Sequence, residues 1–296
     1  MSTTYRIRHL TRYKYHDPVS LCHNLAWLTP RSTPWQEPIR FHLEISPTPS
    51  VLQGRLDAFG NQGHYFEIME PHRTLAVQAL SLIVVRERAQ AEAHDLSWEE
   101  AQAVFRGGCL PEEPANCQFL LDSPHIRISE ELADYARPSF PEGRSLLHGV
   151  TDLMHRIHAD FTYQSLSTTV STPLHEVMAR RTGVCQDFAH VAIGALRSLG
   201  LAARYVSGYL ETLPPPGRPR LVGADASHAW FAVLLPGFGW IDFDPTNDLL
   251  PGQRHVTVAW GRDYSDLPPV KGVVMGGQGE TLEVSVDVAR VDVEEE

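Results

Sequence analysis

The chain has 296 residues and a formal net charge of −11 at pH 7, from 25 Lys and Arg against 36 Asp and Glu. This length allows a large buried core and two domains. An acidic chain without a Lys/Arg stripe is not expected to bind nucleic acid. Because it has no apolar run of about 18 residues, it is not expected to enter a membrane.

The four cysteines are sparse for this length and lack CxxC spacing: Cys22, Cys109, Cys117 and Cys185. A small secreted domain held by disulfides would contain more. The N-terminus also lacks an apolar segment of signal-peptide length. We therefore expect free thiols and a cytoplasmic location.

The first 88 residues are typical of strands. Tyr5, Ile7, His9, Thr11 and Tyr13 alternate with mostly basic residues, which is the period of a half-buried strand. Turn residues separate further strand candidates at 39–45, 55–57, 64–68 and 75–85. Successive strands without helices between them favour an antiparallel sheet, so we predict an N-terminal antiparallel β domain over residues 1–88.

Helix signals begin after this domain. Ser97 followed by Glu100 has the form of a capping box, and further helices are predicted over residues 129–136 and 145–158. We predict a helical connecting region over residues 89–150.

Residues 151–296 mix helices and strands, which makes the predicted fold class α+β. Helices are predicted over 173–181 and 185–199, and strands over 203–210, 228–235 and 240–243. A last strand, over residues 281–291, is expected to tie the two parts of the chain together.

Cys185 stands at the predicted start of an apolar helix, just after Gly183. The positive end of the backbone dipoles at a helix N-terminus favours the thiolate, which is the nucleophilic form. The free N–H groups there can also receive a developing oxyanion. A lone cysteine in such a place is more commonly structural and unreactive, so catalysis requires partners.

Suitable partners follow in a predicted hairpin. His228 opens one strand and Asp244 closes the next, across a turn at 236–239. Neighbouring antiparallel strands bring such side chains within about 8 Å even when they are diagonal. A carboxylate there would fix the tautomer of the imidazole and leave its other nitrogen for the thiol. Asp242, two residues earlier on the same face, is the alternative partner for the histidine.

Three strings in this region, GVCQDFAH, SHAW and GWIDFDPTN, resemble the transglutaminase-like superfamily, in particular its bacterial branch. The resemblance extends over most of the chain, since DAFGN at 57–61 looks like part of the N-terminal β domain of this branch and HVTVAWGRDY at 255–264 is similar to its C-terminal part. It implies a papain-like (transglutaminase-core) catalytic domain over residues 151–296, including the C-terminal strands. It also implies that Cys185 is the nucleophile, His228 the base and Asp244 the third member of a catalytic triad.

Three neighbouring residues are candidates for substrate binding or for the oxyanion: Tyr163, Gln186 and Trp230. Tyr163 belongs to an aromatic motif that the family shares, and it either lines the acyl site or packs in the core. Gln186 either donates toward the oxyanion or caps local backbone. Trp230 shares the face of His228 and would shield it from water.

No cofactor is expected, and the sequence indicates no metal site. His155 and His158 have helical spacing but no evident third ligand, so a surface pair is the default interpretation. Asp187 and His190, one turn apart on the helix of Cys185, are interpreted as a satisfied pair on one helix face.

These residues predict a cysteine-dependent acyl-transfer enzyme that attacks an amide, peptide or isopeptide bond and forms a thioester. Resolution by water gives a peptidase or amidase, and resolution by an amine gives a transglutaminase. Hydrolysis is favoured because an amine must outcompete water at ~55 M and because Arg218 and Arg220, in the loop 213–226, would repel a lysine ammonium. The alternatives are a non-catalytic binding module that retains the fold, or an N-terminal domain that binds the partner while the cysteine is vestigial.

Overall fold

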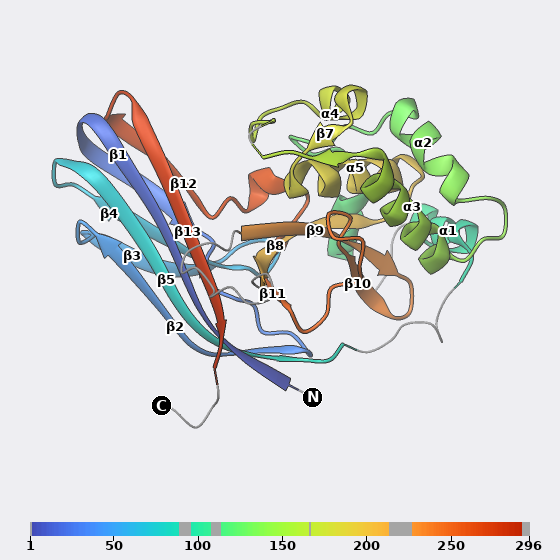
Figure 1. Cartoon of the computed structure of the whole chain (residues 1–296), viewed down its shortest axis with the longest axis horizontal. Helices are drawn as coiled ribbons and strands as arrows, with labels where there is room; N and C mark the ends of the chain where they lie inside the picture. Colours follow the sequence, from blue (N-terminus) through green and yellow to red (C-terminus); the bar gives the residue numbers. More distant parts are fainter. Residues whose placement is uncertain (1, 89–95, 108–113, 166, 213–226, 292–296) are drawn as a thin grey trace, which may run out of the picture.

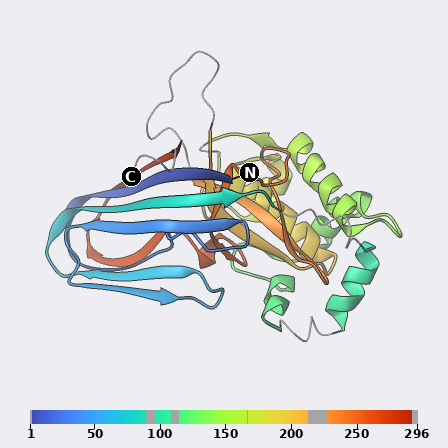
Figure 2. The same ribbon diagram turned by 90° about the horizontal axis from the view of Figure 1, so that it is seen from below.

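The computed structural model describes residues 2–88, 96–107, 114–165, 167–212 and 227–291. An elongated antiparallel sheet lies at one end of the molecule, and a smaller sheet covered by helices lies at the other (Figures 1 and 2). The loop 213–226, with Arg218 and Arg220, lies outside the described residues.

The larger sheet has seven strands arranged around one long strand, β1 (Ser2–Ala26). Its order is β2-β5-β1-β4-β3, and β12 and β13 also pair with β1. The other strands are β2 (Gln36–Ser46), β3 (Val51–Leu56), β4 (Gln62–Ile68), β5 (His72–Arg86), β12 (Val270–Gly276) and β13 (Glu280–Arg290). Every pair in it is antiparallel, which confirms the predicted sheet type.

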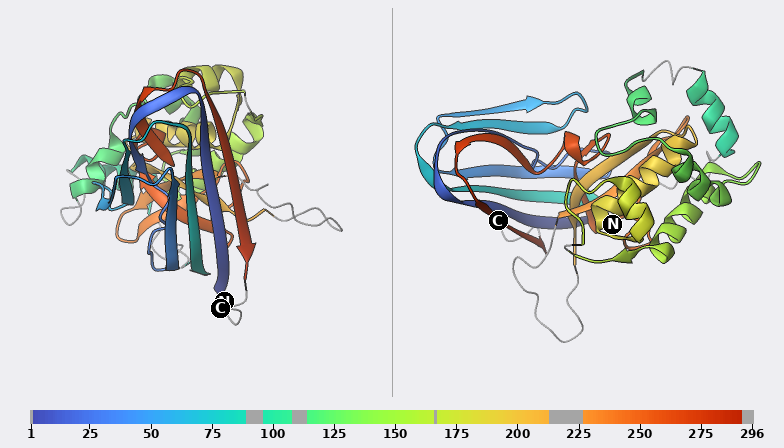
Figure 3. Two further views of the ribbon diagram at one scale, coloured as in Figure 1. Left: turned by 90° about the vertical axis from the view of Figure 1, so that its left-hand side faces the viewer. Right: turned by 90° about the horizontal axis from the view of Figure 1, so that it is seen from above.

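β1 changes partners along its length. Its first half pairs with β5 and β13, and its second half pairs with β4 and β12. The pairing with β5 shifts register between Lys14 and Val19, and the strands curve strongly there (Figure 3). Because β13 pairs with β1 from Tyr5 to Tyr15, the end of the chain returns to the N-terminal sheet after building the other domain.

The smaller sheet has the order β10-β9-β8-β11. Its strands are β8 (Ala203–Leu210), β9 (Ser227–Leu235), β10 (Gly239–Phe243) and β11 (His255–Gly261). The helices are α1 (Trp98–Arg106), α2 (Glu130–Ala136), α3 (Leu146–Asp160), α4 (Leu174–Arg180) and α5 (Cys185–Ser198), with 3₁₀ turns at Pro114–Leu120, Arg137–Ser139 and Tyr264–Asp266. Two short strands, β6 (Thr162–Tyr163) and β7 (Thr182–Gly183), pair in parallel. The predicted capping box is present, since Ser97 Oγ accepts from Glu100 N–H and the Glu100 carboxylate accepts from Ser97 N–H.

α5 is the central helix of this domain. It packs on β8 and β9 on one side and on α2, α3 and α4 on the others (Figure 1). Every residue from Asp187 to Arg197 is buried, so the helix cannot shift without disturbing the core. Its exposed end is its N-terminus, where Cys185 lies.

The two parts share one hydrophobic core. Tyr5 and Ile7 of β1 and Val288 of β13 belong to the same buried cluster as Tyr209 and Val256 of the smaller sheet. The Glu211 carboxylate accepts a hydrogen bond from Tyr5 Oη at 3.1 Å and two from Arg290, at 2.6 and 2.7 Å. The N-terminal domain therefore packs directly on the other domain.

Cys22 and Cys185 are free thiols, whereas Cys117 is disulfide-bonded. The expectation of free thiols throughout is therefore wrong, and the cysteines no longer support a reducing compartment. Within the described ranges, no helix is both long enough and apolar enough to cross a bilayer.

Candidate active site

Cys185 is the first residue of α5 and its side chain is partly exposed. The local fold depends on Asp187, whose Oδ2 accepts hydrogen bonds from Val184 N–H at 2.8 Å and from Thr168 Oγ1 at 2.7 Å. A Cβ at Gly183 would lie 2.7 Å from that Oδ2, so a glycine at this position leaves room for the carboxylate beside the start of the helix. Burial raises the pKa of Asp187 despite these hydrogen bonds.

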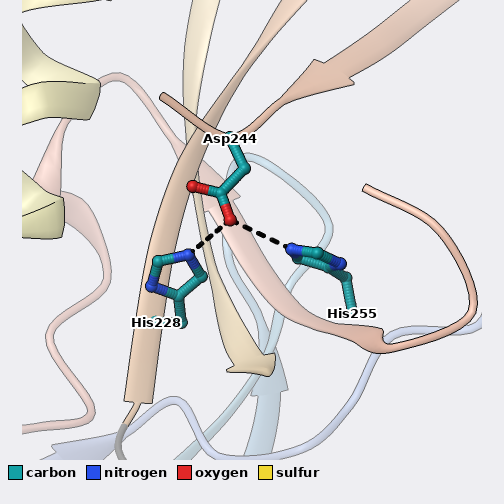
Figure 4. A group of neighbouring side chains, drawn as sticks. All are labelled: His228, Asp244 and His255. Atoms are coloured by element: carbon teal, nitrogen blue, oxygen red, sulfur yellow. Dashed lines mark hydrogen bonds and ion pairs between the residues drawn. The ribbon is translucent and has the colours of Figure 1, made fainter. Parts of the chain in front are cut away.

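His228 lies at the start of β9, on the neighbouring sheet, and is nearly buried. The register of β9 and β10 pairs Phe231 with Phe243, so Asp244, the next residue, stands diagonally across from His228. Its Oδ2 lies 2.7 Å from His228 Nε2 (Figure 4). The expected contact between imidazole and Asp244 is therefore present.

The Asp244 carboxylate is fully buried and accepts five hydrogen bonds. Oδ2 accepts from His228, from His255 Nε2 at 3.1 Å and from Asn247 Nδ2 at 2.8 Å. Oδ1 accepts from the backbone N–H of Thr246 at 3.0 Å and of Asn247 at 3.2 Å. Burial alone would raise the pKa of Asp244, but the hydrogen bonds from His228 and His255 outweigh it, so the pKa falls well below its usual range.

His228 is a strong base in this setting. Burial alone would lower its pKa, but hydrogen bonds to Asp244 and to Cys185 raise the pKa of His228 to about 10. Because Nε2 is bonded to Asp244, Nδ1 is the ring nitrogen that remains available to the Cys185 thiol.

Asp242, the alternative partner, is bound elsewhere. Its Oδ2 accepts from Trp230 Nε1 at 3.0 Å and forms an ion pair with Arg88. Trp230 itself is fully buried, with its ring 6.0 Å from that of His228. It therefore lies beside the imidazole, where it excludes water from one side.

Tyr163 and Gln186 both lie near Cys185. Strand pairing brings Tyr163 close, and Gln186 is the next residue in the chain. Tyr163 pairs with Gly183, two residues before the cysteine, and its side chain is 53% exposed with an edge contact to Phe188. This exposure argues against the core interpretation of Tyr163. The Gln186 amide donates to the carbonyl of Val170 at 3.4 Å, so in this structure it holds a neighbouring loop.

The helix-face interpretation of Asp187 and His190 is wrong, because the two side chains have separate partners. His190 Nε2 accepts from the backbone N–H of Tyr264 at 3.2 Å, and its ring stacks on that of His125. Burial lowers the pKa of His190 to about 3, so the ring is neutral. Both residues hold segments against α5.

His155 and His158 of α3 are both exposed, as the surface interpretation expects. His155 Nδ1 also makes a hydrogen-bond contact with Asp248, and His158 Nδ1 donates to the carbonyl of Thr246 at 3.1 Å. These contacts fix the turn that follows Asp244.

Two residues of the site have no role assigned from the sequence, His255 and Asn247. Both lie inside the strings that resemble the family, but neither stands in a local pattern that indicates a contact with Asp244. From the sequence alone, a histidine such as His255 at the start of an apolar strand is interpreted as a core residue.

A metal ion is a separate possibility, because His228, Asp244 and His255 place ligand atoms within 4.8 Å of one another. Their distances of 2.7 and 3.1 Å are those of direct hydrogen bonds. A bound zinc ion needs ligand atoms about 2.0–2.2 Å from itself, and Asn247 directs an N–H group at the shared oxygen. The three residues therefore fit a hydrogen-bonded carboxylate better than a metal site.

Comparisons with known proteins identify the family of the chain. Residues 5–84 match the family described as "Bacterial transglutaminase-like N-terminal region", and residues 135–245 match the "Transglutaminase-like superfamily". An uncharacterized protein of Mycobacterium tuberculosis is 42% identical over 293 residues, covering 96% of this chain and 92% of its own length. An uncharacterized protein of Mycobacterium leprae is 29% identical over 289 residues, covering 97% and 98%.

Among solved structures, one from Cytophaga hutchinsonii, described as a "Putative Cysteine Protease", superposes with a TM-score of 0.76. It is 21% identical and the match covers 99% of this chain and 92% of that one, which shows a common fold. The chain therefore belongs to the transglutaminase-like superfamily and combines the bacterial N-terminal region with the transglutaminase-like core.

Proposed function

We propose that the chain is a cysteine-dependent acyl-transfer enzyme that acts on amide, peptide or isopeptide bonds. The observation that carries the proposal is the order of three groups: a partly exposed thiol at the start of α5, the His228 ring beside it, and the buried Asp244 carboxylate 2.7 Å behind that ring. A thiol, a base and an orienting carboxylate in this order are the parts that a cysteine nucleophile needs.

In the proposed reaction, the Cys185 thiolate attacks the carbonyl carbon of the scissile amide. The protonated His228 then gives its proton to the leaving nitrogen as the C–N bond breaks, which leaves a thioester on Cys185. Water attacks the thioester while His228 takes a proton from it, and the C–S bond breaks to release the acid. Asp244 orients the ring and stabilises its charged form throughout.

Three further roles belong to the same proposal. Trp230 shields the charged pair from water, because its ring is buried against both histidines. Tyr163 lines the acyl side of the site, since it is exposed and its backbone pairs with Gly183, two residues before Cys185. Gln186 follows the nucleophile directly and is the candidate donor to the oxyanion if its bond to Val170 is exchanged for one to substrate.

We propose hydrolysis as the net reaction and amine transfer as the alternative. Both use the residues above, and water at ~55 M competes with any amine that is not held beside the thioester. A binding module that merely retains the fold has no need for a buried carboxylate held by five donors, so the intact hydrogen-bond network favours an enzyme.

The test is to incubate the protein with a glutamine-containing peptide and an excess of labelled primary amine, and to follow ammonia release and amine incorporation together. Both reactions release ammonia from glutamine, so hydrolysis is measured as the ammonia released minus the amine incorporated. We expect hydrolysis to exceed incorporation, and both to disappear in Cys185→Ala. Incorporation that exceeds hydrolysis would replace the hydrolase with a transglutaminase. Turnover that survives in Cys185→Ala would contradict the proposal as a whole.

A further inference from the structure

The Asp244 carboxylate is shared between two imidazoles. His255, the first residue of β11, is 2% exposed, and its Nε2 lies 3.1 Å from the same Oδ2 that His228 contacts. The two rings approach this oxygen from different sides (Figure 4). The His255 ring also packs edge-on against Trp230, with centroids 5.3 Å apart.

The protonation of His255 follows from its partners. Burial lowers the pKa of His255 despite its hydrogen bond to Asp244, and the charges of His228 and Arg88 act in the same direction as burial. The ring is therefore neutral near pH 7. Since an ionised carboxylate can only accept, the single proton of the ring lies on Nε2 and is donated to Asp244. Nδ1 is buried and has no hydrogen-bond partner among the residues that the structure describes.

A neutral donor has a distinct effect on the carboxylate. It fixes the position of Oδ2 without neutralising its charge, so the full negative charge stays available to His228. Partners that orient a functional group in this way are part of how an active site is preorganised.

The strand that bears His255 is held by the N-terminal domain. β11 is the edge strand of the smaller sheet, and two amide side chains bond to its open edge. Gln36 accepts from Thr257 N–H at 2.8 Å and donates to Thr257 O at 2.7 Å. Asn61 accepts from Trp260 N–H at 3.0 Å and donates to Trp260 O at 2.8 Å.

Each of these side-chain amides therefore makes the two hydrogen bonds that one backbone residue of a neighbouring strand would make. Both are buried, Gln36 at 0% and Asn61 at 1% exposure. Arg31 adds a backbone hydrogen bond to Thr257 O at 3.2 Å, and its guanidinium stacks 3.5 Å above the ring of Trp260. The N-terminal domain thus fixes the strand two residues away from His255.

We propose that His255 is a positioning residue of the active site, and that the N-terminal domain supports the site through β11. This inference rests on the proposed function, because it concerns the same thiol, imidazole and carboxylate. The path is one of direct contacts, from Gln36 to β11, from His255 to Asp244 and from Asp244 to His228.

The test compares His255→Phe, which keeps a ring but removes the donor, with His255→Gln, whose amide nitrogen can still donate to Asp244. The full chain is used, and two properties are measured: the NMR titration midpoint of the His228 ring, and the rate at which iodoacetamide alkylates Cys185. We expect His255→Phe to move the midpoint and to slow alkylation by about tenfold, and His255→Gln to restore both toward wild type. If His255→Phe does not fold, Gln36→Leu tests the same path with an expected slowing of about threefold.

A folded His255→Phe with the wild-type midpoint and alkylation rate would overturn the inference. Equal losses in the Phe and Gln variants would also overturn it, because they would indicate ring packing instead of a hydrogen bond. Failure of the proposed function looks different: Cys185 of the wild-type protein would then react no faster than free glutathione, whatever the variants show.

Discussion

The described residues include two cysteine–histidine pairs, one in the N-terminal sheet and one in the smaller domain. In the N-terminal sheet, Cys22 Sγ lies 3.9 Å from His72 Nε2. In the smaller domain, Cys185 contacts His228. The residue types are the same, but their surroundings differ in three respects.

The partner on the far side of the ring is the first difference. His72 Nδ1 donates to the neutral carbonyl of Glu70 at 2.7 Å, whereas His228 donates to the ionised Asp244. The second difference is exposure, because Cys22 is fully buried and Cys185 is partly exposed. The third is location, since Cys22 lies within a strand and Cys185 begins a helix.

Burial raises the pKa of Cys22, so that thiol stays protonated and inert. The helix start and the His228–Asp244 pair are the features on which the proposed nucleophilic role of Cys185 rests. A cysteine beside a histidine is therefore not enough for a reactive site, and Cys22 serves as an internal control for the experiments below.

The largest expected effect separates the two cysteines directly. Cys185→Ala should lower kcat/KM for amide cleavage by at least about 10⁴-fold, because it removes the nucleophile. Cys22→Ala removes only a buried thiol and should keep kcat/KM within about twofold, with a lower melting temperature. The measurement is steady-state hydrolysis by folded protein. A similar loss in both variants would show that the two pairs do not differ as described.

The next effect concerns the carboxylate that only the second pair possesses. Asp244→Asn should reduce kcat by about 10²–10⁴-fold, because the amide cannot stabilise the imidazolium. Asp242→Asn is the matched control two residues earlier in the hairpin. It should chiefly lower stability, since Arg88 is left with no carboxylate partner in a nearly buried position. Activity measured well below the melting temperature distinguishes them, and a larger kcat loss in the Asp242 variant would reverse their roles.

The sequence was sufficient to predict much of the fold and several contacts of the candidate site. The helix starts at Ser97 and Cys185, the strand that opens near His228 and the diagonal contact with Asp244 all follow from local signals: a cap, a glycine, and alternation across a short turn. The N-terminal sheet was predicted as antiparallel, and the resemblance to the transglutaminase-like superfamily is confirmed.

The remainder depends on contacts between distant segments. Nothing local in His255 or Asn247 shows that they donate to Asp244, because β11 meets β8 only after the whole sheet has formed. Gln36 and Asn61 are separated from β11 by about 200 residues of chain. Asp187 and His190 have suitable helical spacing for a pair, but tertiary partners take both side chains.

The pH dependence of stability distinguishes the two pairs further. The folded pKa of His228 is raised from 6.5 to about 10, so its stabilising contribution is complete below pH 6.5 and is lost as the pH rises toward 10. The pKa of Cys22 is raised from 9.0, so its contribution declines only above about pH 9. Urea unfolding of wild type and His228→Asn should show a difference in unfolding free energy that shrinks between pH 6.5 and 10. A difference that stays constant over this range would contradict the raised pKa of His228.

The smallest expected effect comes from the side chain of Asn247, which supplies one of the five hydrogen bonds to Asp244. Asn247→Ala leaves four donors in place, including both imidazoles. We expect kcat to fall by about two- to twelvefold, because one neutral hydrogen bond contributes about 0.5–1.5 kcal/mol. Kinetics at a fixed pH measures this, with His72→Asn as a control that should leave kcat unchanged. A loss as large as that of Asp244→Asn would mean that the amide, and not the pair of imidazoles, holds the carboxylate.

The measurement that tests the central claim most directly is competitive alkylation near pH 6. Limiting iodoacetamide is shared between the protein and free glutathione, and peptide mass spectrometry reports which thiols are modified. We expect Cys185 to react faster than glutathione, Cys22 to stay unmodified, and the advantage of Cys185 to disappear in His228→Ala. Cys185 reacting no faster than glutathione, or equally fast without His228, would contradict the proposed thiolate–imidazolium pair.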